Sequence, residues 1–124
     1  MSNPAVLFKA LGDETRLRLI HLLLHTEHEL CVCEMVDSLL LPQYQISKHL
    51  TLLKNAGLLQ ANRRGTWVYY HLLREEASLL GELIDLLSRH LPSVYVEDAQ
   101  RLQHRLASRE ADKCVIGFVA ERLL

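Results

Sequence analysis

The sequence predicts one mainly α-helical domain that carries a single β-hairpin. Apolar residues recur at helical spacing along most of the chain, whereas residues 58–72 alternate and are rich in β-branched and aromatic side chains. The chain has 124 residues, of which 49% are hydrophobic and 23% are charged. This is the composition of a globular domain with one core, and it excludes a disordered or fibrous chain.

Four helices are expected before the hairpin, each marked by an apolar stripe and by a cap or a helix breaker. They cover residues 4–11, 13–25, 32–41 and 43–55. Gly12 closes the first helix, and Asp13 is a suitable N-cap for the second. The third must end before Pro42, because proline disfavours the helical conformation of the preceding residue.

The fourth helix has one apolar and one polar face. Its inward stripe is Ile46, Leu50 and Leu53, and Gly57 ends it. The remaining side chains are expected to point outward, and they are polar and partly basic: Gln43, Tyr44, Ser47, Lys48, His49 and Lys54. This face is able to donate hydrogen bonds to a partner.

The hairpin is expected to have strands at 58–61 and 66–72, joined by a basic tip formed by residues 62–65. Amphipathic helices follow at 77–90 and 96–108. Two terminal helices with strong apolar stripes in so small a chain favour a homodimer. We therefore expect one domain over residues 1–108, used for binding and dimerisation, and a tail or short helix over residues 109–124.

Charge is segregated along the chain although the net charge is only −1. Residues 38–74 hold five basic and no acidic residues, while acidic residues predominate on both sides. A helix, a short turn, a second helix and a basic-tipped hairpin form a winged helix-turn-helix, whose second helix enters the DNA major groove. The candidate DNA-binding residues are Gln43, Gln45, Ser47, Lys48, His49, Lys54, Arg63 and Arg64.

The aromatic residues of this region are assigned to packing rather than to DNA. They are Tyr44, Trp67, Tyr69 and Tyr70.

Several other classes of protein are excluded or unexpected. No apolar run approaches the roughly 20 residues of a membrane span, and no Gly-rich phosphate loop or catalytic triad motif indicates an enzyme. With no secretory signal at the N-terminus, we expect a cytoplasmic location.

Cys31 and Cys33 are the most informative residues chemically. Thiolates are soft ligands for ions such as arsenic(III), cadmium(II) or copper(I). Side chains two apart point in nearly opposite directions on a regular helix, so one small ion favours an extended or distorted backbone here. The pair lies where the third helix begins, and the helix dipole favours thiolates there. We expect that ion binding strains this helix start and tilts the recognition helix.

Four segments in this order resemble the ArsR/SmtB family of metal-responsive repressors. They are Leu11–Arg18, Glu29–Glu34, Ile46–Leu53 and Arg64–Tyr70. The likeness covers roughly residues 4–90. It implies a homodimeric winged-helix repressor that leaves an inverted-repeat operator when an inducer binds. The Glu-Leu-Cys-Val-Cys stretch is similar to the branch that senses arsenic(III) and antimony(III) and controls arsenic-resistance operons.

The third ligand of such a site stays open at this point. The arsenic branch often has a third cysteine where this chain has Val36. Cys114 of either subunit or an external thiol such as glutathione is a candidate, and two protein thiolates are also sufficient in principle. For a lone cysteine such as Cys114, burial as a small hydrophobe is the alternative.

Rival functions use the same pair. A cadmium(II), lead or zinc(II) sensor would add His28 or Cys114, and a redox switch would oxidise the thiols without a metal. A zinc site on the terminal helices is not expected, because Asp85 and His90 do not have the spacing that the family implies. A thiol oxidoreductase is disfavoured by the Cys-x-Cys spacing and by the absence of alternating strands and helices.

Overall fold

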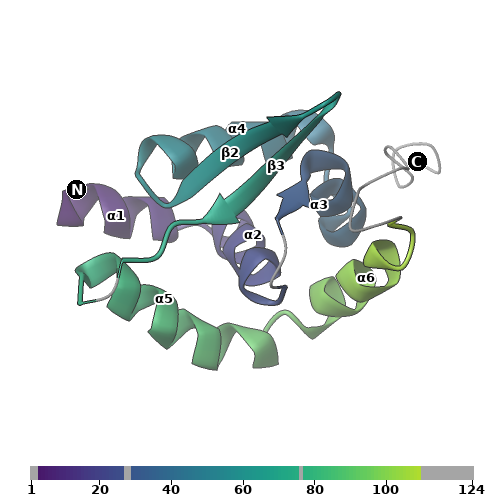
Figure 1. The fold of residues 1–124 in the computed structure, drawn as a ribbon. Helices are drawn as coiled ribbons and strands as arrows, with labels where there is room; N and C mark the ends of the chain where they lie inside the picture. Colours follow the sequence, from purple (N-terminus) through teal and green to yellow (C-terminus); the bar gives the residue numbers. More distant parts are fainter. Residues whose placement is uncertain (1–2, 27–28, 76, 110–124) are drawn as a thin grey trace.

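The computed structural model describes residues 3–26, 29–75 and 77–109. Its elements follow the predicted order, with one additional short strand (Figure 1). They are α1 (Pro4–Leu11), α2 (Glu14–Leu24), β1 (Leu30–Cys31), α3 (Val32–Leu39), α4 (Gln43–Asn55), β2 (Leu59–Arg64), β3 (Trp67–Leu72), α5 (Leu79–His90), the 3₁₀ turn η1 (Leu91–Ser93) and α6 (Val96–Leu106). The mainly α-helical winged helix-turn-helix fold is confirmed.

The first two helices are joined by local hydrogen bonds. The Asp13 carboxylate accepts a hydrogen bond from the Arg16 backbone N–H at 3.1 Å, which confirms Asp13 as the N-cap of α2. The Arg16 side chain then reaches back to α1, where it donates to the carbonyls of Ala10 at 2.6 Å and Lys9 at 3.2 Å. These carbonyls lie at the end of α1, where the Lys9 carbonyl also accepts a hydrogen bond from the Gly12 backbone N–H at 3.2 Å.

The helix-turn-helix unit consists of α3, three connecting residues and α4. Leu40, the first connecting residue, has a left-handed backbone with φ of 57°, and Pro42 precedes α4. Ile46, Leu50 and Leu53 are all fully buried, as the apolar stripe of α4 predicts. The recognition helix is therefore fixed to the core along one whole face.

The hairpin differs from the prediction at its tip. Strand β2 continues through Arg64, which pairs with Trp67, so the connection is only Gly65-Thr66. The predicted tip of residues 62–65 is therefore wrong, because three of its four residues pair with β3. Gly65 has φ of +62°, a conformation that glycine adopts without strain.

A third strand is absent from the sequence prediction. Strand β1 pairs antiparallel with β3, opposite Tyr70 and Tyr69, and gives the sheet order β1-β3-β2. Two residues are too few to show alternation in a sequence. This pairing attaches Cys31 directly to the hairpin.

Helix α6 lies beside α3 and is held there by arginines (Figure 1). Arg18 of α2 donates to both carboxylate oxygens of the buried Asp98, at 2.7 and 2.9 Å, and to the Leu39 carbonyl at 3.0 Å. Arg101 of α6 donates to the Ser38 carbonyl at 2.6 Å. The C-terminal end of α3 is thereby capped by two guanidinium groups from neighbouring helices.

The terminal helices show the expected apolar faces. On α5, Ile84 is buried and the neighbouring leucines of its stripe are partly buried against the core. Val6 and Phe8 of α1 and Leu86 of α5 are exposed. Within the described part of the chain, no helix is long and apolar enough to cross a membrane. The predicted tail over 109–124 is described only at Arg109, which packs onto the domain.

His21 is a titratable group inside the core. It is fully buried in α2, and among the described residues neither ring nitrogen has a hydrogen-bond partner. Burial lowers the pKa of His21 below its usual value near 6.5, and the neighbouring His25 lowers it further. The ring is thus neutral when folded and takes up a proton more readily on unfolding.

We therefore predict that the contribution of His21 to the free energy of unfolding is constant above about pH 7, and that the free energy of unfolding falls as the pH drops below about 6. His21→Phe should lose less stability on acidification than the native chain. Burial also lowers the pKa of His49, so part of the acid sensitivity should remain. Urea unfolding at about pH 7 and again below about pH 6 measures the free energy of unfolding of each variant. His90→Phe, on the exposed end of α5, is the control. Equal pH dependence of the native chain and His21→Phe would contradict the prediction.

Candidate inducer site and DNA-binding surface

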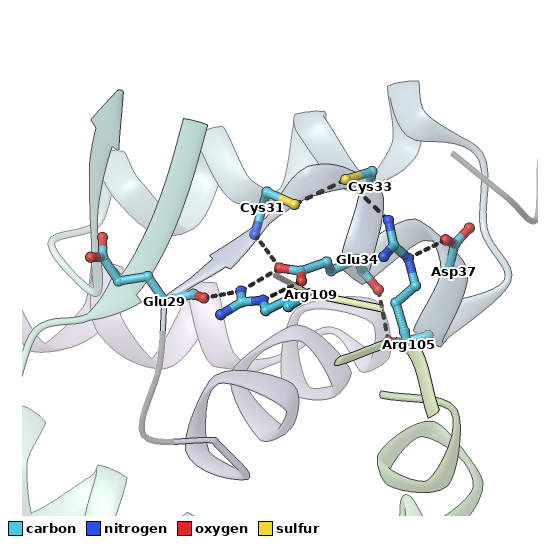
Figure 2. A network of polar contacts seen from close by, with 8 residues as sticks. Glu29, Cys31, Cys33, Glu34, Asp37, Arg105 and Arg109 are labelled. Carbon is cyan, nitrogen blue, oxygen red and sulfur yellow. Dashed lines mark hydrogen bonds and ion pairs between the residues drawn. The ribbon is translucent and has the colours of Figure 1, made fainter. Parts of the chain in front are cut away.

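Cys31 and Cys33 meet at the junction of strand and helix. Cys31 ends β1 with an extended backbone, φ −91° and ψ 165°, and Cys33 lies in the first turn of α3. Their Sγ atoms are 2.9 Å apart, and no disulfide joins them (Figure 2). A distorted, partly extended backbone is what the spacing predicts for two sulfurs that face one another. The junction therefore presents a preformed dithiol.

The thiols are shielded from solvent. Cys31 is 1% exposed and Cys33 is 2% exposed, and they pack with Tyr69 in a small cluster at the edge of which lies Trp67. Both aromatic residues belong to β3, so their assignment to hairpin packing is confirmed. A ligand that reaches the sulfurs must displace part of this cover.

A buried ion pair stands beneath the thiols. The Glu34 carboxylate is fully buried, and it accepts hydrogen bonds from Arg109 at 2.5 and 2.6 Å and from the Cys31 backbone N–H at 3.0 Å (Figure 2). Burial acts to lower the pKa of Arg109, but its hydrogen bonds with Glu34 raise that pKa above its usual value. Both carboxylate oxygens are occupied, so Glu34 is a positioning residue rather than a metal ligand.

A second guanidinium group adjoins the sulfurs. Nη2 of Arg105 lies 3.6 Å from Cys33 Sγ, while Nε donates to the Asp37 carboxylate at 2.7 Å. A cation beside a thiol favours the thiolate, which is the form that binds soft ions and attacks electrophiles. The Arg105 guanidinium group is thus a second positive influence on the thiols, in addition to the helix dipole at the start of α3.

The sequence prediction misses these charged residues. Glu34 has a local signal, since it follows Cys31 at the N3 position, where acidic residues accept hydrogen bonds from the N-cap backbone. Arg105 and Arg109 carry only a weak signal, namely two arginines four residues apart at the end of a helix. Nothing local connects them to cysteines more than seventy residues earlier.

Glu29 links the thiol segment to the hairpin. Its carboxylate forms an ion pair with Arg64 and accepts a hydrogen bond from the Asn62 amide at 3.1 Å. Its backbone carbonyl accepts one from Arg109 at 2.5 Å. The Arg64 guanidinium also lies over the Tyr69 ring, 4.9 Å from its centre. The hairpin and the dithiol therefore share one polar network.

Cys31 and Cys33 are the only cysteines among the described residues. Over residues 3–26, 29–75 and 77–109, no three His, Cys, Asp or Glu side chains lie close enough together to hold a metal ion. Val36, at the position of the missing third cysteine, is buried. Cys114 and His28, the predicted further ligands, lie outside the described residues.

The predicted DNA-binding residues fall on α4 and β2. Gln43, Lys48 and Lys54 are exposed on α4, and Gln45 and Ser47 are half-buried there. Arg63 and Arg64 are exposed on β2, with Arg64 engaged by Glu29. In Figure 1, α4 and the hairpin tip lie on the side of the molecule opposite α5. The basic residues of the helix and the wing thus lie in the part of the fold that a winged helix-turn-helix turns toward DNA.

Two expectations for α4 are wrong. His49 is expected to point outward, but it is only 9% exposed, and its Nδ1 lies 3.2 Å from Arg16 Nη1. It sits at the edge of the inward stripe, next to Arg16 of α2 and to Asp13, the N-cap of that helix. The outward direction expected for Tyr44 is confirmed, because it is 76% exposed near the start of α4, and its assignment to packing is wrong. Tyr44 is thus the better candidate of the two for contact with DNA.

Comparison with known proteins shows the family. Residues 13–61, from the N-cap of α2 into β2, match the family described as "Bacterial regulatory protein, arsR family". The chain is 38% identical over 104 residues to the arsenic resistance transcriptional regulator ArsR2 of Pseudomonas putida, a match that covers 84% of this chain and 90% of that protein. The chain belongs to the arsR family.

Two further relatives carry different names. ArsR1 of Pseudomonas putida, another arsenic resistance regulator, is 51% identical over 70 residues, which is 56% of this chain. The chain covers about half of the length of that relative, 54%. A cadmium resistance regulator, the CadC homolog of Staphylococcus aureus, is 38% identical over 95 residues, covering 74% of this chain and 78% of that protein.

The solved structures agree with the fold. HlyU from Vibrio cholerae superposes with a TM-score of 0.60 at 35% identity, covering 68% of this chain and 87% of that structure. Members of the arsR family are DNA-binding transcriptional regulators and not enzymes, and this chain is one of them.

The DNA-binding surface makes a quantitative prediction. Each phosphate that a basic residue neutralises contributes about −0.9 to the slope of log K against log salt for duplex DNA. Lys48→Ala should therefore make the slope less negative by about 0.9 for each phosphate that the complex no longer neutralises. Arg89→Ala, on the distant α5, should leave the slope unchanged and is the matched control. Salt titration of DNA binding by fluorescence anisotropy measures both, and equal slopes for the native chain and Lys48→Ala would remove Lys48 from the interface.

Proposed function

We propose that this arsR family regulator is a homodimeric repressor of an arsenic-resistance operon that acts in the cytoplasm. In this proposal it leaves an inverted-repeat operator when arsenite or antimonite binds Cys31 and Cys33. The observation that carries the proposal is the buried dithiol at the start of α3, with sulfurs 2.9 Å apart and a guanidinium group beside one of them.

The donor set fits a thiophilic metalloid. Arsenic(III) and antimony(III) are soft and bind thiolates. In water, arsenite is the neutral acid As(OH)₃, which condenses with two thiols to form two As–S bonds and release two water molecules. The third position of the arsenic is then filled by Cys114 of either subunit, by an external thiol such as glutathione, or by its own oxygen.

The surroundings of the thiols support a route from inducer to DNA. A ligand on the sulfurs competes with the contact between Arg105 and Cys33. It also distorts the junction of β1 and α3, where the Glu34 carboxylate accepts a hydrogen bond from the Cys31 N–H. This is the first turn of α3, which packs against the recognition helix α4. The proposed result is a change in the tilt of the recognition helices in the dimer, and with it the loss of their spacing on the operator.

The hairpin offers a second route. Cys31 pairs with Tyr69 of β3, and Glu29, two residues before Cys31, holds Arg64 near the tip. Movement of the thiol segment would therefore shift Glu29 and with it Arg64, a candidate for contact with a DNA phosphate. Both DNA-binding elements thus adjoin the segment that carries the proposed inducer site.

The alternatives use the same two thiols. A cadmium(II), lead or zinc(II) sensor is supported by the relative named for cadmium resistance, and it requires further ligands such as His28 or Cys114. A redox switch is supported by the closeness of the two reduced sulfurs. In that case an oxidant such as peroxide takes two electrons and two protons from the pair, which forms a disulfide.

The test is inducer-dependent release from DNA. An operator duplex is first selected from random sequences by the reduced protein, and arsenite is then titrated while the anisotropy of the labelled duplex is followed. Arsenite should weaken binding of the native chain at least about tenfold, which is about 1.4 kcal/mol in coupling free energy. The Cys31→Ser, Cys33→Ser double variant should stay bound, since serine keeps the size but not the soft ligand.

Cys114→Ser is the matched control, because it removes a thiol outside the pair. If it responds like the native chain, the pair alone is the inducer site. If the native chain stays bound to DNA in arsenite, the arsenic proposal is wrong. Release by cadmium or by peroxide, absent in the double variant, would then select one of the alternatives.

A further inference from the structure

We infer that Arg105 is a specificity-determining residue that selects an oxygen-bearing inducer at the dithiol. Its guanidinium group donates a hydrogen bond to the one oxygen that arsenic(III) or antimony(III) keeps after it has bound Cys31 and Cys33. The inference rests on the proposed function, because it concerns the same two thiols.

The position of Arg105 is fixed by the fold. The residue is 6% exposed near the end of α6, and its Nε is bonded to the Asp37 carboxylate at 2.7 Å. Nη2 lies 3.6 Å from Cys33 Sγ, which is itself 2.9 Å from Cys31 Sγ. Figure 2 shows the guanidinium group between Cys33 and Asp37. Any atom that bridges the two sulfurs is therefore a close neighbour of this cation.

The chemistry of the metalloid matches such a neighbour. When As(OH)₃ condenses with two thiols, two As–O bonds are replaced by two As–S bonds, two water molecules leave, and the oxidation state does not change. One hydroxyl group remains and completes a neutral, three-coordinate arsenic. Its oxygen has lone pairs, and a guanidinium group has only donors. A third sulfur ligand is then unnecessary, which accounts for Val36 at the position of a third cysteine.

The same arrangement disfavours a divalent metal ion. Zinc and cadmium on two thiolates still need about two more donors with lone pairs, and a guanidinium group supplies none and repels a cation. Among the described residues, no third His, Cys, Asp or Glu side chain joins the two thiols in a group that could hold a metal ion. Arg105 thus presents a donor to the oxygen and repels a divalent cation.

A pair of matched arsenicals tests this inference. Methylarsonous acid, CH₃As(OH)₂, condenses with two thiols as arsenite does, but a methyl group of similar size replaces the remaining hydroxyl. Binding of both compounds to the reduced full chain is measured by isothermal titration calorimetry. Arg105→Met should weaken arsenite about tenfold, the effect of one hydrogen bond from a charged donor, and should change methylarsonous acid less than about twofold.

Cadmium provides the opposite readout. In Arg105→Met, the positive charge next to Cys33 is removed, so a bound divalent cation is repelled less and cadmium affinity should rise, as followed by the thiolate-to-cadmium charge-transfer absorption. Arg101→Met is the control, because Arg101 lies one turn earlier on α6 and contacts Asp98 and the Ser38 carbonyl instead of the thiols. It should leave all three affinities unchanged.

A further variant keeps the test valid if the single variant does not fold. Arg105→Met with Asp37→Asn removes both charges of the buried pair, and it should show the same loss of arsenite affinity as Arg105→Met. Circular dichroism verifies the fold of each variant.

The outcomes separate the two claims. If neither arsenical binds the native chain, the proposed function itself fails. If both arsenicals bind through the cysteines but lose affinity equally in Arg105→Met, or if arsenite loses none, the role of Arg105 is wrong and the proposed function stands. An effect of Arg105→Met seen only in a Cys114→Ser background would make Cys114 the third ligand and would also overturn the inference.

Discussion

The structure depends on the buried ion pair of Glu34 with Arg109. A fully buried carboxylate without a partner would cost several kcal/mol, so Glu34 must be neutralised where it stands, in the first turn of α3. Arg109 does this with two hydrogen bonds, and the Cys31 N–H adds a third. The pair thereby fixes the chain after α6 against the beginning of α3. It also sets the turn that brings Cys31 and Cys33 together.

Helix α3 is consequently held at both ends by groups from outside it. Its first turn is fixed by Arg109, and the carbonyls of its last turn accept hydrogen bonds from Arg18 and Arg101. We expect a short helix held at both ends in this way to move as a whole when a ligand distorts its first turn. A ligand at its first turn therefore acts on the whole helix and on the three-residue connection to α4. The same thiol segment contacts the hairpin through Glu29 and Arg64, so the proposed inducer site adjoins both elements that are proposed to bind DNA.

How much of the fold and the site can be predicted from the sequence depends on how local each signal is. The stripe of Ile46, Leu50 and Leu53 predicts the recognition helix, and Cys-x-Cys predicts a thiol pair on a distorted backbone, because both patterns lie within a few residues. Strand β1 is too short to show a period. The contacts of Arg105 with Cys33 and of Arg109 with Glu34 join residues 72 and 75 positions apart, which no local pattern reveals. His49 is misplaced by the prediction because its burial comes from α2 and not from its own helix.

Hydrogen exchange with and without arsenite is the most direct test that the dithiol binds the inducer and controls the DNA-binding elements. The Cys31 amide, bonded to Glu34, and the amides of the paired strands β2 and β3 are the reporters. We expect arsenite to change exchange at the start of α3 and in the hairpin of the native chain, and to leave both unchanged in the Cys31→Ser, Cys33→Ser variant. Release from DNA by arsenite with unchanged exchange at these amides would contradict the coupling, and an equal response of the cysteine variant would place the inducer elsewhere.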